Sequence, residues 1–208
     1  MILIGPYDSP FVRRVGIVLT LYGLPFEHRP WSAFSDADKV GVLNPLTRVP
    51  TLLLEGEEVL VDSVTILDHL DGLVPEDRRL APPAGVGRRD ALRLAALAMG
   101  AADKAVALVF ERVFHPAPSE AWSARCRSQI LGTLGMLESE ASRRTTPFLC
   151  GPWIGHADIA LGVAWRFIAE AHPGLATDAA FPALAVRAAR LESLPVFRAI
   201  AQPFTPPA

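Results

Sequence analysis

The group best placed for anion chemistry in this sequence is a serine hydroxyl at the predicted start of a helix. Ser9 stands before Pro10, and apolar residues at helical spacing follow as far as Gly23. Serine is a preferred N-cap, proline is favoured at the first helical position and glycine at the end, so a helix is predicted after Ser9. The free N–H groups and dipole of such a helix start attract anions. A serine here also has a structural explanation, because it satisfies orphan backbone donors.

Two further features have chemical as well as structural interpretations. Asp62 and Ser63 open a second predicted helix, where they either cap it or, with its free N–H groups, bind a carboxylate. Val49 precedes Pro50 at the start of a predicted strand. Spacing alone does not make this bond cis, because only about 5 to 6% of X-Pro bonds are cis in folded proteins. Each feature is common, but the ordered set within one small unit is not.

The elements that position these groups follow from hydrophobic patterning and turn residues. The strands are predicted over residues 1–5, 26–30, 49–54 and 59–61. The helix after Ser9 separates the first two strands, and the helix that Ser63 opens follows the fourth. The polar residues 32–43 predict a short irregular helix. This βαβ-ββα order predicts an α/β domain over residues 1–78.

The remainder of the chain is predicted to be helical. Residues 79–89 are rich in proline, glycine and charge, which is typical of an interdomain linker. Helices are then predicted over residues 90–113, 120–143, 157–171 and 183–192, with a short one after Pro195. Because strand signals are absent, residues 90–208 are predicted to form an all-α domain, and the fold class is α/β plus all-α.

Composition argues against several classes of function. The 208 residues are 50% hydrophobic and carry a formal net charge of -2. No run of Lys and Arg is interleaved with aromatic residues, so nucleic acid is not an expected partner. The longest apolar stretch, residues 91–109, contains Arg93, Asp103 and Lys104, which predicts a soluble helix and no membrane span. Because the N-terminus has neither a basic leader nor a signal-length apolar segment, we expect a cytoplasmic protein.

The cysteines and histidines predict neither a metal site nor a hydrolase. Cys126 and Cys150 form no C-x-x-C pair and have no histidine at ligand spacing, so we expect buried structural thiols. The five histidines fit no metal-binding motif. Ser9 has no evident His and Asp partners for a catalytic triad.

Several segments together carry a resemblance to a known family. They are residues 7–15 (YDSPFVRRV), 44–52 (NPLTRVPTL), 62–67 (DSVTIL), 151–153 (GPW) and 156–160 (HADIA). With these segments the chain resembles the cytosolic glutathione transferases over essentially its whole length, and especially bacterial members with a serine at the thiolate position. The resemblance implies a thioredoxin-like N-terminal domain that binds glutathione, followed by a helical bundle domain.

The resemblance implies a role for each residue of a glutathione site. Ser9 donates a hydrogen bond to the glutathione sulfur. Val49 pairs its backbone with the cysteinyl residue, and Pro50 is the family's cis-proline that makes this pairing possible. Asp62 faces the ammonium of the γ-glutamyl end, while the hydroxyl and N–H of Ser63 face its carboxylate.

Four other polar side chains leave alternatives open. Arg48 is close enough in sequence to help bind the other carboxylate of glutathione. Tyr7 is the rival of Ser9, because other classes of the family use a tyrosine near the end of the first strand, but only Ser9 stands at the helix cap. Arg13 and Arg14 either raise the potential near the thiolate or, as is more usual on a helix, face solvent or an ion-pair partner.

One serine at a helix start is sufficient in magnitude to stabilise a thiolate. A free thiol has a pKa of about 8.5, and lowering it by two units takes about 2.7 kcal/mol. A partly buried helix N-terminus supplies up to about 2 kcal/mol, and a hydrogen bond to a charged acceptor adds about 1.5 to 3 kcal/mol. Because position 9 is not cysteine, thiol-disulfide exchange through the protein's own thiol is not expected.

In the family, the electrophile pocket lies between the loop after the first strand and the first long helix of the second domain. This implies a pocket built from Tyr7, Phe11, Phe110 and Phe114, and more weakly from Trp165. For each of the aromatic side chains, core packing is at least as good an explanation.

The family also has a buried N-capping box before an apolar helix of the second domain. Asp158 stands in the acidic position of this box, but Gly155 replaces the usual Ser or Thr, so half of the cap is missing. We expect Asp158 to accept backbone N–H groups and to have a structural role.

The resemblance thus implies an enzyme, a glutathione S-transferase that conjugates the thiolate of reduced glutathione to a small hydrophobic electrophile. The alternatives are another glutathione-dependent reaction, such as maleyl isomerisation, dehalogenation or ether cleavage, or a non-enzymatic binding or regulatory protein. Glutathione is expected as co-substrate without a metal. A homodimer and a role in detoxification are expected from the family.

Overall fold

The computed structural model describes residues 1–207, which divide by their contacts into two compact units. The first unit comprises Met1–Arg79 and Pro195–Pro207, and the second comprises Leu80–Leu194. Each unit has its own buried core, and each is described here by itself.

The first unit contains a four-stranded mixed sheet. Its strands are β1 (Ile2–Ile4), β2 (Glu27–Arg29), β3 (Thr51–Leu53) and β4 (Val59–Val61), in the spatial order β2-β1-β3-β4. β2 pairs parallel to β1, whereas β3 pairs antiparallel to both β1 and β4. It follows that β4 runs in the same direction as β1. This is the thioredoxin-like arrangement that the resemblance implied.

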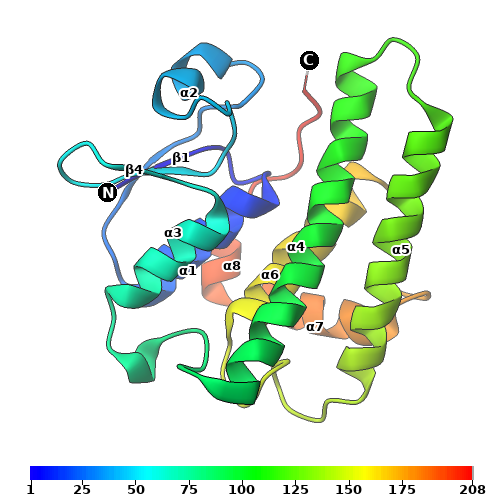
Figure 1. Cartoon of the computed structure of the whole chain (residues 1–208). Coiled ribbons are helices and arrows are strands. Elements are labelled where there is room, and N and C mark those ends of the chain that lie inside the picture. Colours follow the sequence, from blue (N-terminus) through cyan, green and yellow to red (C-terminus); the bar gives the residue numbers. More distant parts are fainter. Residues whose placement is uncertain (208) are drawn as a thin grey trace. The chain divides into compact units, whose positions relative to one another are not determined.

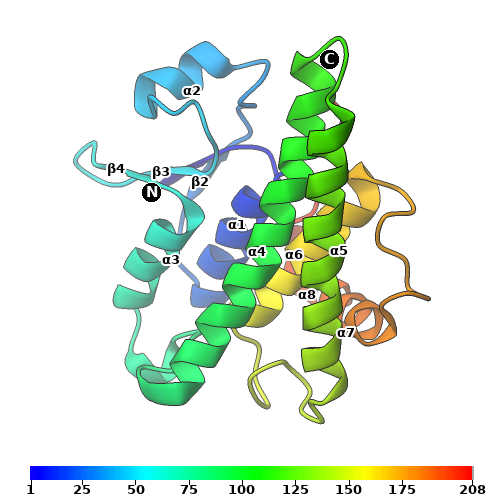
Figure 2. The ribbon, with the colours of Figure 1, turned by 45° about the vertical axis from the view of Figure 1, so that its right-hand side comes forward.

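Three helices accompany the sheet. They are α1 (Pro10–Tyr22), α2 (Ala37–Leu43) and α3 (Ser63–Gly72), and a short 3-10 turn, η1 (Glu76–Arg78), follows. α1 and α3 contact each other on one side of the sheet, and α2 lies on the other side (Figures 1 and 2). The polar segment 32–43 is helical only from Ala37 onward, so that prediction is confirmed in part. α1 begins and ends where its capping residues predict, with Gly23 in the left-handed conformation at φ 69°.

The last segment of the chain packs with the first unit, although the sequence placed it at the end of the helical domain. Helix α8 (Pro195–Ala199) contacts α1, and its Phe197 is fully buried. Arg13 of α1 donates from Nε to the carbonyl of Ile200 at 2.7 Å and from Nη2 to that of Phe197 at 2.9 Å. Sequence spacing gives no indication of these bonds.

The second unit is helical throughout. Its helices are α4 (Gly85–Phe114), α5 (Glu120–Ser142), α6 (His156–Ala171) and α7 (Pro182–Glu192). α4 packs against α5 along its length and also against α6 (Figure 1), and small buried residues of α4 such as Ala98 and Ala102 allow this close approach. α4 begins at Gly85, inside the segment predicted as linker, because glycine at φ 77° permits the turn into the helix. No helix among residues 1–207 has the length and apolarity to span a membrane.

The expected role of Asp158 is confirmed, and the structure explains the glycine beside it. Asp158 accepts the N–H of Leu149 at 2.7 Å and that of Gly155 at 3.0 Å. A Cβ atom on Gly155 would lie 2.8 Å from the carbonyl oxygen of Leu80, to which His156 N–H donates at 2.9 Å. The close approach of Leu80 therefore excludes the usual Ser or Thr.

The prediction that both cysteines are buried is correct for only one of them. Cys126 lies in the core of the second unit and is fully buried, whereas Cys150 is exposed. Cys150 lies in a turn between α5 and α6. The sequence around it carries no periodicity that would have revealed this exposure.

Replacing Asp158 by Ala is predicted to destabilise the second unit, because the buried N–H of Leu149 and the partly buried N–H of Gly155 lose their acceptor, the first at about 1 to 3 kcal/mol. The melting temperature should fall by about 2 to 4 °C for each kcal/mol lost. Circular dichroism recorded during heating measures the melting temperature of each variant. Asp178→Ala changes an exposed aspartate of the same unit and serves as control. Equal melting temperatures for the two variants would contradict the capping role.

Candidate functional site

Strand register brings the chemically interesting segments to one edge of the sheet. Ile4 of β1 is paired with Thr51 of β3, and Thr51 is paired with Val61 of β4. The chain leaves β1 at this row toward Ser9, enters β3 from Val49–Pro50, and leaves β4 toward Asp62. Ser9, Val49–Pro50 and Asp62–Ser63 therefore emerge side by side, although they are far apart in sequence.

A tight turn at Gly5 brings two of these segments into close contact. Gly5 has φ 125°, and a Cβ atom on it would lie 2.8 Å from Cβ of Val49 and would also collide with the side chain of Val12. Its N–H donates to the carbonyl of Arg29 at 2.9 Å. Only glycine fits this backbone and this space. The residues preceding α1 are thus held directly beside Val49.

Ser9 is the N-cap of α1, as predicted, and part of its hydrogen-bonding capacity is unused. Its Oγ accepts the N–H of Val12 at a distance of 3.5 Å. The hydroxyl hydrogen of Ser9 donates to no acceptor among residues 1–207. The N–H of Phe11, in the first turn, has no acceptor within the helix. An anion near Ser9 would therefore meet a hydroxyl, an amide and the positive end of a helix dipole.

Val49 offers an unpaired stretch of backbone. The Val49–Pro50 peptide bond is cis, as the resemblance implied. Neither the N–H nor the carbonyl of Val49 is hydrogen-bonded to another of the described residues. The buried Asn44 supports this loop, because its Nδ2 donates to the carbonyl of Arg48 at 2.9 Å and its Oδ1 accepts from Leu46. Sequence analysis treated Asn44 only as a turn residue and missed this supporting role.

Asp62 and Ser63 begin α3, and a buried arginine lies behind them. The exposed Asp62 has φ 68° and caps the helix by accepting the N–H of Val64 at 2.8 Å. Ser63 is buried, and its Oγ accepts from Nη1 of Arg14 at 3.4 Å. Burial lowers the pKa of Arg14 to about 10, while Asp62 and Asp71 act to raise it. The guanidinium therefore stays protonated at neutral pH.

Neither arginine of α1 faces solvent. The relative exposure of Arg13 is 2% and that of Arg14 is 4%, so the alternative in which these side chains face solvent is wrong. Arg13 holds the C-terminal segment through backbone carbonyls, with its guanidinium 5.3 Å from the ring of Phe197. Hydrogen-bond acceptors from other elements make this burial possible, and local sequence does not reveal them.

The C-terminal segment also contacts the loop that precedes Ser9. Oε1 of Gln202 accepts the backbone N–H of Tyr7 at 3.2 Å. Oδ2 of Asp8 accepts the N–H of Thr205 at 3.3 Å. These bonds connect residues at the two ends of the chain, so sequence analysis had no means of finding them. They help to fix the loop that carries Ser9.

The ring of Tyr7 is packed against the body of α1. It stacks on His28 with 3.9 Å between ring centroids and an interplanar angle of 12°. A Cβ atom on Gly16 would lie 2.8 Å from Cε1 of Tyr7, which places the ring about two turns along α1 from Ser9. Burial raises the pKa of the Tyr7 phenol.

The other predicted site residues divide between the two units. In the first unit, Arg48 is exposed immediately before Val49, and Phe11 is half-buried in the first turn of α1. In the second unit, Phe110 and Phe114 are 39% and 61% exposed and form an edge-to-face pair with 5.6 Å between centroids. Trp165 is different, because it is buried in the helical core and makes an edge-to-face contact with Phe181 at 6.3 Å.

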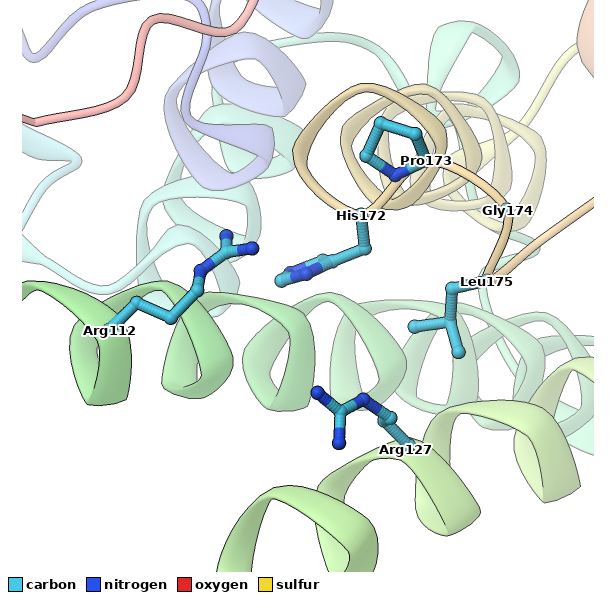
Figure 3. Close-up of a pocket in the computed structure, with 6 residues that line it drawn as sticks. All are labelled: Arg112, Arg127, His172, Pro173, Gly174 and Leu175. Carbon is cyan, nitrogen blue, oxygen red and sulfur yellow. The ribbon is translucent and has the colours of Figure 1, made fainter. Parts of the chain in front are cut away.

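A cavity of about 350 Å³ in the helical unit contains none of the predicted site residues. It is lined by Arg112, Arg127, His172, Pro173, Gly174 and Leu175. Figure 3 shows the two guanidinium groups extending from α4 and α5 toward the imidazole. Arg112 donates to the carbonyl of Ala171 at 3.2 Å, and Nε2 of His172 lies 2.9 Å from the carbonyl of Ala105. These contacts fix the end of α6, which gives this cationic cluster a structural role.

Comparison with known proteins identifies the family. Residues 3–78 match the model of the glutathione S-transferase N-terminal domain, and residues 120–186 match that of the glutathione S-transferase C-terminal domain. A glutathione S-transferase structure from Methylobacterium radiotolerans, in complex with glutathione sulfonate, has 33% identity and a TM-score of 0.89, with 98% of this chain and 97% of that chain covered. The chain belongs to the glutathione S-transferase family. It is therefore an enzyme of the transferase class.

Two other relatives agree with this assignment. A glutathione S-transferase structure from Methylobacillus flagellatus, with glutathione bound, is 25% identical with a TM-score of 0.86, and covers 96% of this chain and 98% of that chain. The probable glutathione S-transferase GSTU1 of Oryza sativa subsp. japonica is 29% identical over 199 residues, which are 91% of this chain and 84% of the rice protein. Residues 1–207 contain no group of three or more His, Cys, Asp or Glu arranged to hold a metal.

Replacing Gln202 by Ala is predicted to loosen the loop before Ser9, because the N–H of Tyr7 loses its acceptor. A neutral hydrogen bond is worth about 1 kcal/mol, so exchange of this amide should accelerate about five-fold. Hydrogen-exchange mass spectrometry of a peptide containing Tyr7 measures the rate. Gln129→Ala changes an exposed glutamine of α5 and is the control. If the exchange rate of the Tyr7 amide is unchanged in both variants, the C-terminal segment does not restrain the loop before Ser9.

Proposed function

We propose that this transferase conjugates the thiolate of reduced glutathione to a small hydrophobic electrophile, with Ser9 as its catalytic residue. One observation carries the assignment: the hydroxyl hydrogen of Ser9 and both backbone groups of Val49 lack partners among residues 1–207 and emerge from the same edge of the sheet. A cysteinyl residue paired with Val49 would direct its sulfur toward the start of α1. The two relatives crystallised with glutathione sulfonate and glutathione support this choice of ligand.

The chemistry at Ser9 is stabilisation of the sulfur anion. Oγ of Ser9 accepts from Val12, which leaves its hydrogen available to donate to a thiolate. The N–H of Phe11 and the helix dipole add to this interaction. Because a thiolate, and not a thiol, is the nucleophile, the rate of conjugation rises with the fraction ionised. The product is a thioether, and the leaving group departs with the electron pair of the broken bond.

The remaining glutathione contacts follow the same edge of the sheet. Asp62 is exposed and acidic, which suits the γ-glutamyl ammonium, and Ser63 with the α3 N-terminus suits the adjacent carboxylate. Arg48 is exposed beside Val49 and suits the glycyl carboxylate. Tyr7 is less suited than Ser9 to the sulfur, since its ring stacks on His28 away from the helix start.

The electrophile is proposed to bind against aromatic side chains. In the first unit, Phe11 lies beside the proposed sulfur position. In the second unit, described by itself, the exposed pair Phe110 and Phe114 offers an apolar surface on α4. Tyr7 completes the proposed set. We also propose the homodimer that is usual in the family, which light scattering of the purified protein measures directly.

Replacing Ser9 by Ala is predicted to slow conjugation of glutathione to 1-chloro-2,4-dinitrobenzene. Loss of one hydrogen bond to a charged acceptor costs about 1.5 to 3 kcal/mol, so kcat should fall by about ten-fold to about 150-fold. Because the thiol pKa rises, the pH profile of kcat/KM should move to higher pH. Steady-state assays between pH 6 and 9 measure both effects, on the scale of an ordinary thiol pKa of about 8.5.

Tyr7→Phe is the comparison variant, because it keeps the aromatic ring that is proposed to contact the electrophile and removes only the phenolic hydroxyl that could replace Ser9 at the sulfur. It should retain nearly wild-type kcat and an unshifted pH profile. The opposite pattern, with Tyr7→Phe inactive and Ser9→Ala unaffected, would transfer the role to Tyr7. A wild-type protein that binds no glutathione at millimolar concentration and conjugates none would overturn the proposed function altogether.

A further inference from the structure

We propose that Arg14 is a positioning residue for the γ-glutamyl end of glutathione, acting through the hydroxyl of Ser63. Arg14 donates from Nη1 to Oγ of Ser63, which leaves the hydroxyl hydrogen of Ser63 to donate to the carboxylate of the substrate. This inference rests on the proposed function, because it requires glutathione to bind with its γ-glutamyl end at Asp62–Ser63.

The burial of Arg14 is unusual for a contact that only packs two helices together. Arg14 lies on α1 with 4% relative exposure, and Ser63 lies at the start of α3 with 2%. Removing a guanidinium from water costs several kcal/mol, and apolar side chains of similar size usually serve such an interface as well or better. Nε of Arg14 has no hydrogen-bond partner among residues 1–207. The buried charge of Arg14 therefore lowers the stability of the fold. This cost favours a role for Arg14 at the adjacent proposed γ-glutamyl site, Asp62–Ser63.

Two carboxylates attract the guanidinium of Arg14, and its hydrogen bond to Ser63 is present alongside these interactions. Asp62 and Asp71 both interact favourably with the guanidinium. Asp71 is itself fixed, because the hydroxyl of Tyr22 donates to its Oδ1 at 2.5 Å. Oδ1 of Asp62 accepts the N–H of Val64 at the exposed start of α3. The cation is therefore attracted by two acids that are themselves hydrogen-bonded, and its Nη1 donates to the serine oxygen.

The hydrogen bond from Arg14 to Oγ of Ser63 determines which kind of ligand group the Ser63 hydroxyl can bind. A serine hydroxyl has one donor and two acceptor sites, and a guanidinium can only donate. With Arg14 on one lone pair, the hydrogen of Ser63 is free, and no acceptor for it occurs among residues 1–207. A ligand that approaches past the exposed Asp62 can pair with this hydrogen only by supplying an acceptor, which a carboxylate does and an ammonium does not. The buried cation also attracts the negative charge of that carboxylate.

Variants of Arg14 and Ser63, assayed with two thiols, test this inference. The thiols are glutathione and Cys-Gly, which lacks the γ-glutamyl residue, with 1-chloro-2,4-dinitrobenzene as electrophile. Arg14→Gln should raise KM for glutathione about ten-fold, equivalent to about 1.4 kcal/mol, and leave kcat within about two-fold. Its kcat/KM for Cys-Gly should equal that of the wild type. A role limited to packing α1 on α3 would affect both thiols alike.

A double-mutant cycle shows whether Arg14 acts through Ser63. If it does, Arg14→Gln should add less than about two-fold to the KM increase caused by Ser63→Ala. Arg14→Lys keeps a buried donor and should restore part of the glutathione affinity, and it replaces Arg14→Gln in the cycle if that variant does not fold. Arg13→Lys, on the neighbouring buried arginine, is the control and should affect both thiols equally.

Two results would overturn the role of Arg14 while leaving the proposed function intact. One is an equal loss of kcat/KM with glutathione and Cys-Gly in the Arg14 variants. The other is a KM increase in the double variant that equals the product of the single increases. Failure of the wild type to use glutathione at all would instead contradict the proposed function.

Discussion

The pairing of Ile4, Thr51 and Val61 in one row of the sheet is the constraint on which the candidate site depends. A shift of one residue between strands would turn every side chain to the other face and separate the segments that follow. With the observed register, the starts of α1 and α3 and the entry to β3 lie along a single edge. Gly5 then permits the close approach that brings the first of these segments against Val49.

This arrangement gathers groups of different electrostatic character within a small region. The start of α1 offers a hydroxyl and free amides, Val49 offers both backbone groups, and the start of α3 offers an acid and a serine supported by Arg14. Each suits a different part of one peptide ligand: a sulfur anion, an amide backbone and an amino acid end. In the proposed mode of binding, backbone groups provide much of the recognition, so fixed strand and helix ends determine its geometry as much as side chains do.

Most helices and strands could be predicted from the sequence, because the residues that determine where each element begins and ends lie within or next to that element. The caps Ser9 and Asp62, the glycine after α1 and the hydrophobic periodicities each act within a few residues, and the elements formed where they indicate. The burial of Arg13 and Arg14, the bond from Tyr7 to Gln202 and the exposure of Cys150 depend on partners distant in sequence or on turn geometry. No pattern in the neighbouring residues encodes these partners. The loss of the usual hydroxyl at Gly155 was visible in sequence, but its cause, the approach of Leu80, was not.

Stabilisation of the sulfur anion at Ser9 is the central claim, and titration of the thiol in the protein–glutathione complex tests it most directly. Ultraviolet difference absorbance of the thiolate, followed against pH, reports the pKa of the bound thiol. The account predicts a value about two units below the ordinary thiol pKa of about 8.5 in the wild type, and a return toward that value in Ser9→Ala. Bound glutathione with an unshifted thiol pKa, or a shift that survives in Ser9→Ala, would contradict it.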